Sequence, residues 1–349
     1  MRQRSTFRAR TWLAATALAV GVVIAAITPA FADARIGKFT ITFAEGVFHR
    51  NGDFVIPGAV HGVSPDGDFK ADRAFGNYQR QDVTLVGHVL MHQRVGQGPG
   101  TAPLTLTTNQ LRVSGKPSTY TATGSVVVVQ ANRKLHADYL SLNDATHQGL
   151  LRGKVSAQED DRVVNSDEIH YNTLSGNIDV PGELTGFSSD TDFRAARGFG
   201  NQKAGTFTMI GHVIVHRFGK YSKANNSSEP LTLWCDKLDI VRRPETTYTA
   251  TGHTKVAQGD KTLVAPLLTL NDTTHTATMT GGVHGEELPD RTFDAAEVVY
   301  NTVTEDFKAL GGVKATFPFR RAASTATPAP SSRPPLRPSP TPLPAPTHS

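Results

Sequence analysis

The chain has 349 residues, with 36 Lys and Arg against 31 Asp and Glu and one cysteine, Cys235. Eight of the arginines lie at the two ends, namely Arg2, Arg4, Arg8, Arg10, Arg320, Arg321, Arg333 and Arg337. Without them 28 basic residues face 31 acidic ones, so the charge gives no case for nucleic-acid binding. A single cysteine excludes an internal disulfide, so the body depends on its own core.

Residues 1–32 have the pattern of a secretory signal peptide. A basic segment precedes the apolar run Trp12–Ile27, and Ala30-Phe31-Ala32 gives a small-x-small cleavage site. An uncleaved membrane anchor is the alternative, although sixteen apolar residues are fewer than the about 20 that span a bilayer. We therefore expect an exported, periplasmic protein, with the inner-membrane anchor as the second option.

The body contains a long internal duplication. The segment Leu140–Val155 (LSLNDATHQGLLRGKV) recurs as Leu268–Val283 (LTLNDTTHTATMTGGV), and DFKADRAFGN recurs as DFRAARGFGN at an offset of 124 residues. The offset grows to 127 and 128 after the dissimilar stretches Val95–Ala102 and Phe218–Glu229, which we expect to be loops. The sequence therefore predicts two repeats, residues 33–186 and 187–320, followed by a disordered Pro-rich tail at 321–349.

Both repeats have the pattern of stacked β-hairpins. Apolar residues alternate with polar ones, Asn-Asp and similar pairs supply turns, and each unit of about 20 to 35 residues closes on Gly-x-Val, as at Gly153-Lys154-Val155. No segment of the mature chain has a 3.6-residue apolar stripe. We expect an all-β fold in which hairpins share one core because a single hairpin cannot bury its apolar face.

Alternation also predicts which residues share the interior face, while Thr105, Ser141, Thr232 and Thr269 face water. This face is either the core of an ordinary sandwich or an apolar groove kept open for a ligand. Its predicted members are Leu104, Leu106, Leu140, Leu142, Ile169 and Tyr171 in the first repeat and Leu231, Leu233, Leu268, Leu270, Val298 and Tyr300 in the second.

The segments LHADYLSLNDATHQGLLRGKV, VNSDEIHYNTLSGNIDV and DAAEVVYNTVTEDFKALGGV resemble the OstA-like repeats of periplasmic lipopolysaccharide-transport proteins, the LptA and LptC family. The resemblance covers roughly residues 54–319. It implies a tandem OstA-like open β-jellyroll that holds lipid A acyl chains in a groove made by the twelve interior residues. This chain departs from the family in having two units and a Pro-rich tail.

The resemblance implies a carrier of lipopolysaccharide between the two membranes. Its partners would be an inner-membrane extracting transporter and an outer-membrane translocon, joined by edge-strand pairing, with head-to-tail self-association as a further option. The alternative function is a non-enzymatic envelope scaffold with a fully packed β-solenoid core.

The sequence gives little reason to expect catalysis or a metal. His88/His92 and His212/His216 are spaced to share a strand face, but no further ligand stands near them in the sequence. No nucleophile elbow, phosphate loop or dinucleotide fingerprint is present. A glycan-active β-helix enzyme would need clustered carboxylates, and none is indicated. We expect no enzyme, no catalytic residue, no cofactor and no metal, with Cys235 as a buried thiol.

Overall fold

The computed structural model describes residues 35–36, 39–65, 67–94, 102–115, 118–143, 145–218, 230–302, 304 and 306–318. Within these residues every regular element is a β-strand, and the strands pair antiparallel. The predicted all-β fold of stacked hairpins, an open β-jellyroll, is therefore confirmed. The expected signal peptide (1–32) and the expected tail (321–349) lie outside the described residues.

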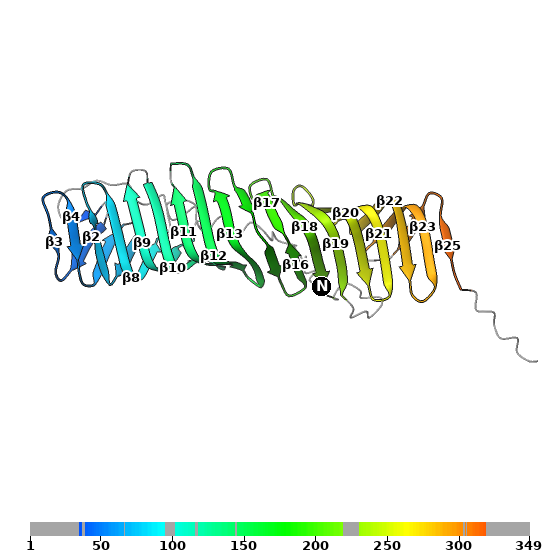
Figure 1. Ribbon diagram of the computed structural model, residues 1–349, viewed down its shortest axis with the longest axis horizontal. Helices are drawn as coiled ribbons and strands as arrows, with labels where there is room; N and C mark the ends of the chain where they lie inside the picture. The colour runs from blue at the N-terminus through cyan, green and yellow to red at the C-terminus, as the bar shows by residue number, and fades with distance from the viewer. Residues whose placement is uncertain are drawn as a thin grey trace, which may run out of the picture.

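Hairpins stacked along one axis form a single elongated body (Figure 1). The strands of the first half are β1 (Arg35–Ile36), β2 (Phe39–Phe43), β3 (Val47–Phe48), β4 (Asp53–Ile56), β5 (Val60–Ser64), β6 (Gly67–Ala71), β7 (Arg73–Asn77), β8 (Asp82–Gln93), β9 (Leu104–Gly115), β10 (Ser118–Gln130), β11 (Arg133–Asn143), β12 (Gln148–Glu159) and β13 (Arg162–Asn172). Those of the second half are β14 (Asn177–Val180), β15 (Leu184–Phe187), β16 (Thr191–Ala195), β17 (Arg197–Asn201), β18 (Thr206–Arg217), β19 (Leu231–Val241), β20 (Thr247–Gln258), β21 (Lys261–Asn271), β22 (Thr276–Glu287), β23 (Arg291–Asn301), β24 (Phe307–Leu310) and β25 (Lys314–Thr316).

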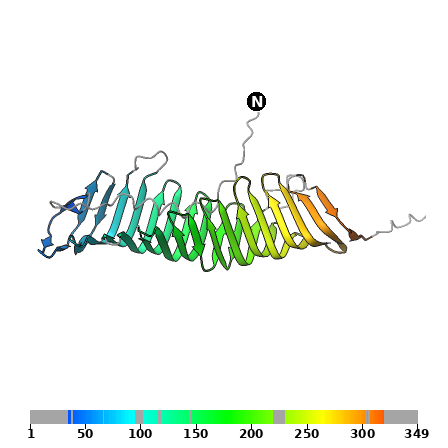
Figure 2. The same cartoon turned by 90° about the horizontal axis from the view of Figure 1, so that it is seen from above.

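The strands form two walls that meet along one edge. We call the layer containing β4, β7, β14, β17 and β24 the A wall, and the layer containing β5, β6, β15, β16 and β25 the B wall. Each long strand contributes one half to each wall: β8, for example, pairs with β7 through residues 82–86 and with β6 through residues 90–93. Figure 2 shows the stacked strands along the same axis from a second direction. The hairpin turns at the far end of each wall are called the A rim and the B rim.

A bulge at the middle of the strand makes the corner between the walls. Strand register shifts at Gly153-Lys154 in β12, where φ is +74° and +49°, and the next residue, Val155, points into the core with 1% exposure. Two successive positive φ values favour glycine at the first position, because an L side chain there is strained. The sequence interpretation of Gly-x-Val as the close of a hairpin was therefore wrong, since β12 continues to Glu159.

The same corner recurs along the whole body. Positive φ pairs occur at Gly87-His88, Gly124-Ser125, Gly211-His212, Gly252-His253 and Gly281-Gly282, and each lies at a register shift. The residue after each pair is buried: Val89, Val126, Val213, Thr254 and Val283. The need for this corner explains why the glycine-containing motif recurs at nearly every second long strand.

The duplication seen in the sequence is also a structural repeat. Strands β4 to β13 recur as β14 to β23 in the same pairing order, and the sheet continues without interruption from one set to the next. The expected boundary between residues 186 and 187 falls inside β15, which pairs with both β13 and β16. The division into two units at that point stays a prediction.

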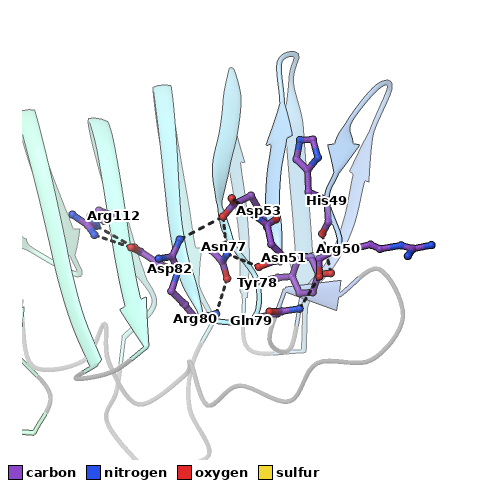
Figure 3. Close-up of polar contacts among 10 residues, drawn as sticks. All are labelled: His49, Arg50, Asn51, Asp53, Asn77, Tyr78, Gln79, Arg80, Asp82 and Arg112. Atoms are coloured by element: carbon purple, nitrogen blue, oxygen red, sulfur yellow. Dashed lines mark hydrogen bonds and ion pairs between the residues drawn. The ribbon is translucent and has the colours of Figure 1, made fainter.

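Asparagines fix the A-rim turns in both copies. Asn77 Nδ2 donates to Asp53 Oδ1 (2.6 Å) and to Asn51 O, and its Oδ1 accepts from Arg80 N at 2.8 Å (Figure 3). In the second copy Asn201 makes the same three bonds, to Asn177 Oδ1, Ser175 O and Ala204 N. The hydrogen bond from Asn77 is the largest cause of a lowered pKa of Asp53. Each turn is thereby joined to the turn before it.

Aromatic rings in the interior lie against glycines on the paired strand. A Cβ added to Gly149 would be 1.8 Å from Tyr171 Cζ, and one added to Gly285 would be 2.0 Å from Phe293 Cε1. Gly149 in β12 lies directly opposite Tyr171 in β13, and Gly285 in β22 lies directly opposite Phe293 in β23. The absent side chain makes the space that the ring fills.

We predict that Gly149→Ala lowers the free energy of unfolding by about 1–3 kcal/mol, because the Tyr171 ring has to leave its position. Gly182→Ala is the matched control, since an added Cβ there has no neighbour within 4 Å. Urea unfolding of both variants checks the prediction, and equal stability of the two would contradict it.

Candidate functional site: the apolar interior

The interior between the walls holds all twelve residues that alternation assigned to one face. The strand corner divides them, however, between two walls: Leu104, Leu106, Leu231 and Leu233 lie on the B wall, and the other eight lie on the A wall. Eight of the twelve are buried, Leu268 being the most exposed of these at 8%. The other four, Leu231, Leu233, Leu270 and Tyr300, differ from their first-copy equivalents in being only half-buried. Their role in lipid binding stays a prediction.

The two copies differ in how far their interior is covered. Leu142 is 1% exposed, whereas Leu270, in the same place in the second copy, is half-buried. Seven pairs of identical residues follow this rule, buried in the first copy and partly exposed in the second: Leu104/Leu231, Leu106/Leu233, Tyr120/Tyr248, Val128/Val256, Leu135/Leu263, Leu142/Leu270 and Tyr171/Tyr300.

Position along the strand separates these residues from the fully buried ones. In the second copy the residues near the corner, such as Ala250, Val283 and Val298, are at most 2% exposed. The half-buried residues lie farther along the strands, toward the rims. The second copy therefore has a packed floor beneath apolar side chains that are accessible from outside.

Sequence reasoning missed several members of this partly exposed set. Ile240, Tyr248, Val256, Leu263 and Phe293 also pack against the core without being fully buried. Tyr248 and Val256 were detectable from their first-copy equivalents, Tyr120 and Val128. The apolar alternation that identifies these residues is present in both copies of the repeat. Extending it along the full length of each strand would have found them.

Cys235 lies on the floor of the second copy, at the corner of β19. It is 3% exposed, and burial, with a smaller contribution from the negative charge of Asp236, raises its pKa to about 12. The thiol is therefore protonated at neutral pH and inert. The prediction that Cys235 is buried is confirmed.

The histidine pairs do not converge on a metal. His88 stands at an exposed corner with its Nδ1 2.8 Å from Asp72 Oδ2, whereas His92 lies on the B wall, 3.2 Å from Asp68 Oδ2. His216 likewise contacts Asp192, whereas His212 lies at the corner of β18, as His88 lies at the corner of β8. Among the described residues no group of three or more His, Cys, Asp or Glu is arranged to hold a metal ion.

A half-buried arginine lies at the A rim of the second copy. Arg242 follows β19, and burial lowers its pKa to about 10, so the guanidinium is charged at neutral pH while partly removed from water. Smaller contributions to this pKa come from Tyr248 and Glu159, which raise it, and from Arg162, which lowers it. Sequence analysis did not single out this residue.

No protein-family model and no curated protein matches the chain. Among solved structures it is similar to LptH of Pseudomonas aeruginosa, described as the LptA-homologous periplasmic component of the lipopolysaccharide transport device. The match covers 53% of this chain and 94% of LptH, at 9% identity and a TM-score of 0.18. At these values the likeness carries no argument about function. In the described part of the chain no helix is long and apolar enough to span a membrane.

We predict that Cys235 does not react with Ellman's reagent at pH 8 in the native protein, because the thiolate is absent and the sulfur is covered. Reaction is expected only after unfolding in guanidinium, which serves as the positive control. Rapid native reaction would mean that the floor of the second copy opens to solvent.

Proposed function

We propose that this chain is a periplasmic lipopolysaccharide-transport protein that carries the lipid A part of its ligand in an apolar β-jellyroll groove between the inner and outer membranes. The observation that carries the proposal is the partly exposed apolar lining of the second copy, with Leu233, Leu263 and Leu270 among its members. Apolar surface left in contact with water gains about 25 cal/mol per Å² when acyl chains cover it. The resemblance of the hairpin motifs to OstA-like repeats supports the same function.

The proposed role requires binding and release, not chemistry. We therefore assign no catalytic residue, no cofactor and no metal to the interior. The twelve residues expected from the sequence are proposed as lining, with the half-buried ones, Leu231, Leu233, Leu270 and Tyr300, as the members that a ligand reaches first.

The edge strands at the two ends of the body have exposed apolar side chains, which supports the proposed pairing with partner proteins. At one end β3 carries Val47 and Phe48, each 51% exposed, and at the other Phe307 in β24 is 46% exposed. Edge strands with exposed apolar side chains are suited to pairing with a strand of another protein. We propose that these edges join the inner-membrane transporter, the outer-membrane translocon or a second copy of the chain.

A second candidate function is a non-enzymatic envelope scaffold. The interior positions of the first copy favour it, because Leu104, Leu142 and Tyr171 are at most 4% exposed. If the second copy were covered in the same way, the body would be a packed β-solenoid without room for a ligand.

We predict that Leu233→Asp and Leu270→Asp each weaken lipid A binding at least about tenfold, because a carboxylate in the lining opposes apolar contact. Titration of lipid A into the purified protein, followed by native mass spectrometry, measures the change. Thr232→Asp and Thr269→Asp are the matched controls, since they place the same charge on the outward face of the same strands.

Thermal unfolding confirms that each variant is folded before binding is compared. Leu270→Trp adds a second arm, because it fills the interior without adding charge and is also expected to lower binding. Unchanged lipid A binding by folded Leu233→Asp and Leu270→Asp variants would favour the scaffold.

A further inference from the structure

Two rows of inward-facing residues form the lining of the second copy, one row on each wall. Within a row, each residue lies directly opposite the next one on the neighbouring strand. The A-wall row is Ile240, Tyr248, Leu270, Ala277, Tyr300 and Phe307, and the B-wall row is Leu233, Val256, Leu263, Gly285, Phe293 and Ala315. The last large side chain of each row is therefore a phenylalanine, at the end of the body where β23 and β25 lie (Figure 1).

These two phenylalanines touch across the interior. Phe307 lies on the A wall opposite Tyr300, and Phe293 lies on the B wall opposite Ala315. Their ring centroids are 5.1 Å apart at an interplanar angle of 77°, which is an edge-to-face contact. The contact joins the two walls at the end of the strand stack.

The Phe293 ring also extends over the strand before its own. A Cβ added to Gly285 in β22 would be 2.0 Å from Phe293 Cε1 and 2.4 Å from Phe293 Cζ. The residue of the A-wall row on the same strand is Ala277, which is also small. The ring therefore fills space that both rows leave open at β22.

The first copy has aliphatic residues at both places. Val164 in β13 corresponds to Phe293, and Ile178 in β14 corresponds to Phe307, at a common offset of 129 residues. There the sheet continues beyond them, because β14 pairs with β17 and β15 pairs with β16. The aromatic contact is thus specific to the copy in which the stack of strands ends.

The partly exposed lining is also bounded on its other side. Phe207 in β18 lies opposite Ile240 and is buried, at 4% exposure. The half-buried side chains of the A-wall row then run from Ile240 in β19 to Tyr300 in β23. Four strand steps of about 4.8 Å separate these strands, so this part of the lining is about 19 Å long.

We propose that Phe293 and Phe307 form the end wall of this lining and set the length of the acyl chain that the second copy accepts. The inference rests on the proposed function, because it requires an acyl chain that lies along the two rows. Each methylene group that such a chain buries strengthens binding about fourfold. The gain stops where the chain meets the two rings.

The test measures how binding depends on chain length, in the full chain. The probes are decanoic, tetradecanoic and octadecanoic acid, with the uncharged apolar dye N-phenyl-1-naphthylamine as a probe that does not depend on chain length. The double variant Phe293→Val with Phe307→Ile restores the first-copy residue at both places. Phe199→Ile is the matched control, because it removes a 41% exposed ring from the outward face of the A wall.

In the wild type and in Phe199→Ile we expect affinity, measured by isothermal titration calorimetry, to rise from decanoic to tetradecanoic acid and to level off by octadecanoic acid. In the double variant we expect it to keep rising, so that octadecanoic acid binds at least about tenfold more tightly than it binds the wild type. Binding of the dye is expected to be unchanged. Thermal unfolding checks that the double variant is folded, and the single variants Phe293→Val and Phe307→Ile replace it in the test if it is not.

The outcomes separate this inference from the proposed function. If the variant levels off at the same chain length as the wild type, the end wall is overturned and the carrier stands. An affinity that keeps rising through octadecanoic acid in the wild type overturns the end wall in the same way. If the wild type binds neither the dye nor any of the acids, both are overturned. Loss of dye binding in the folded variant would assign the two rings a structural role instead.

Discussion

Every long strand has to pass from one wall to the other, and the backbone that makes this corner governs the rest of the structure. Two successive positive φ values, as at Gly153-Lys154, bend the strand and shift its register. The residue that follows then points inward, which is why Val155 and its counterparts in other strands are buried. The corner thus creates two facing layers from one continuous sheet, and with them an interior that hairpins alone would lack.

Local chemistry made much of the fold predictable. Asn143 and Asn271 accept hydrogen bonds from backbone N–H groups two and three residues later, as expected of residues that begin turns. Alternation identified the inward residues because the side-chain period of a strand is two. The corner escaped detection because Gly-x-Val is equally compatible with a strand end, and only the pairing of both strand halves with different partners distinguishes the two.

The candidate site was less predictable because it depends on distant parts of the chain. Leu142 and Leu270 lie in nearly identical sequences, yet one is buried and the other half-buried. Their exposure depends on what lies across the interior, and no local pattern encodes that. Arg242 is similar, because the burial that lowers its pKa to about 10 is not visible in the sequence around it. The repeat supplies a common framework, and the two copies differ in how far their interior side chains are exposed.

The order of strand pairing also determines how far the protein reaches. Along the A wall, eight steps separate β4 from its second-copy equivalent β14, through β7 and β8 to β13. At a strand spacing of about 4.8 Å, one copy extends the body by about 38 Å. A stack of this kind has no closure condition, so another copy lengthens it without altering the contacts already made. Gene duplication is then a means of setting the length of the body.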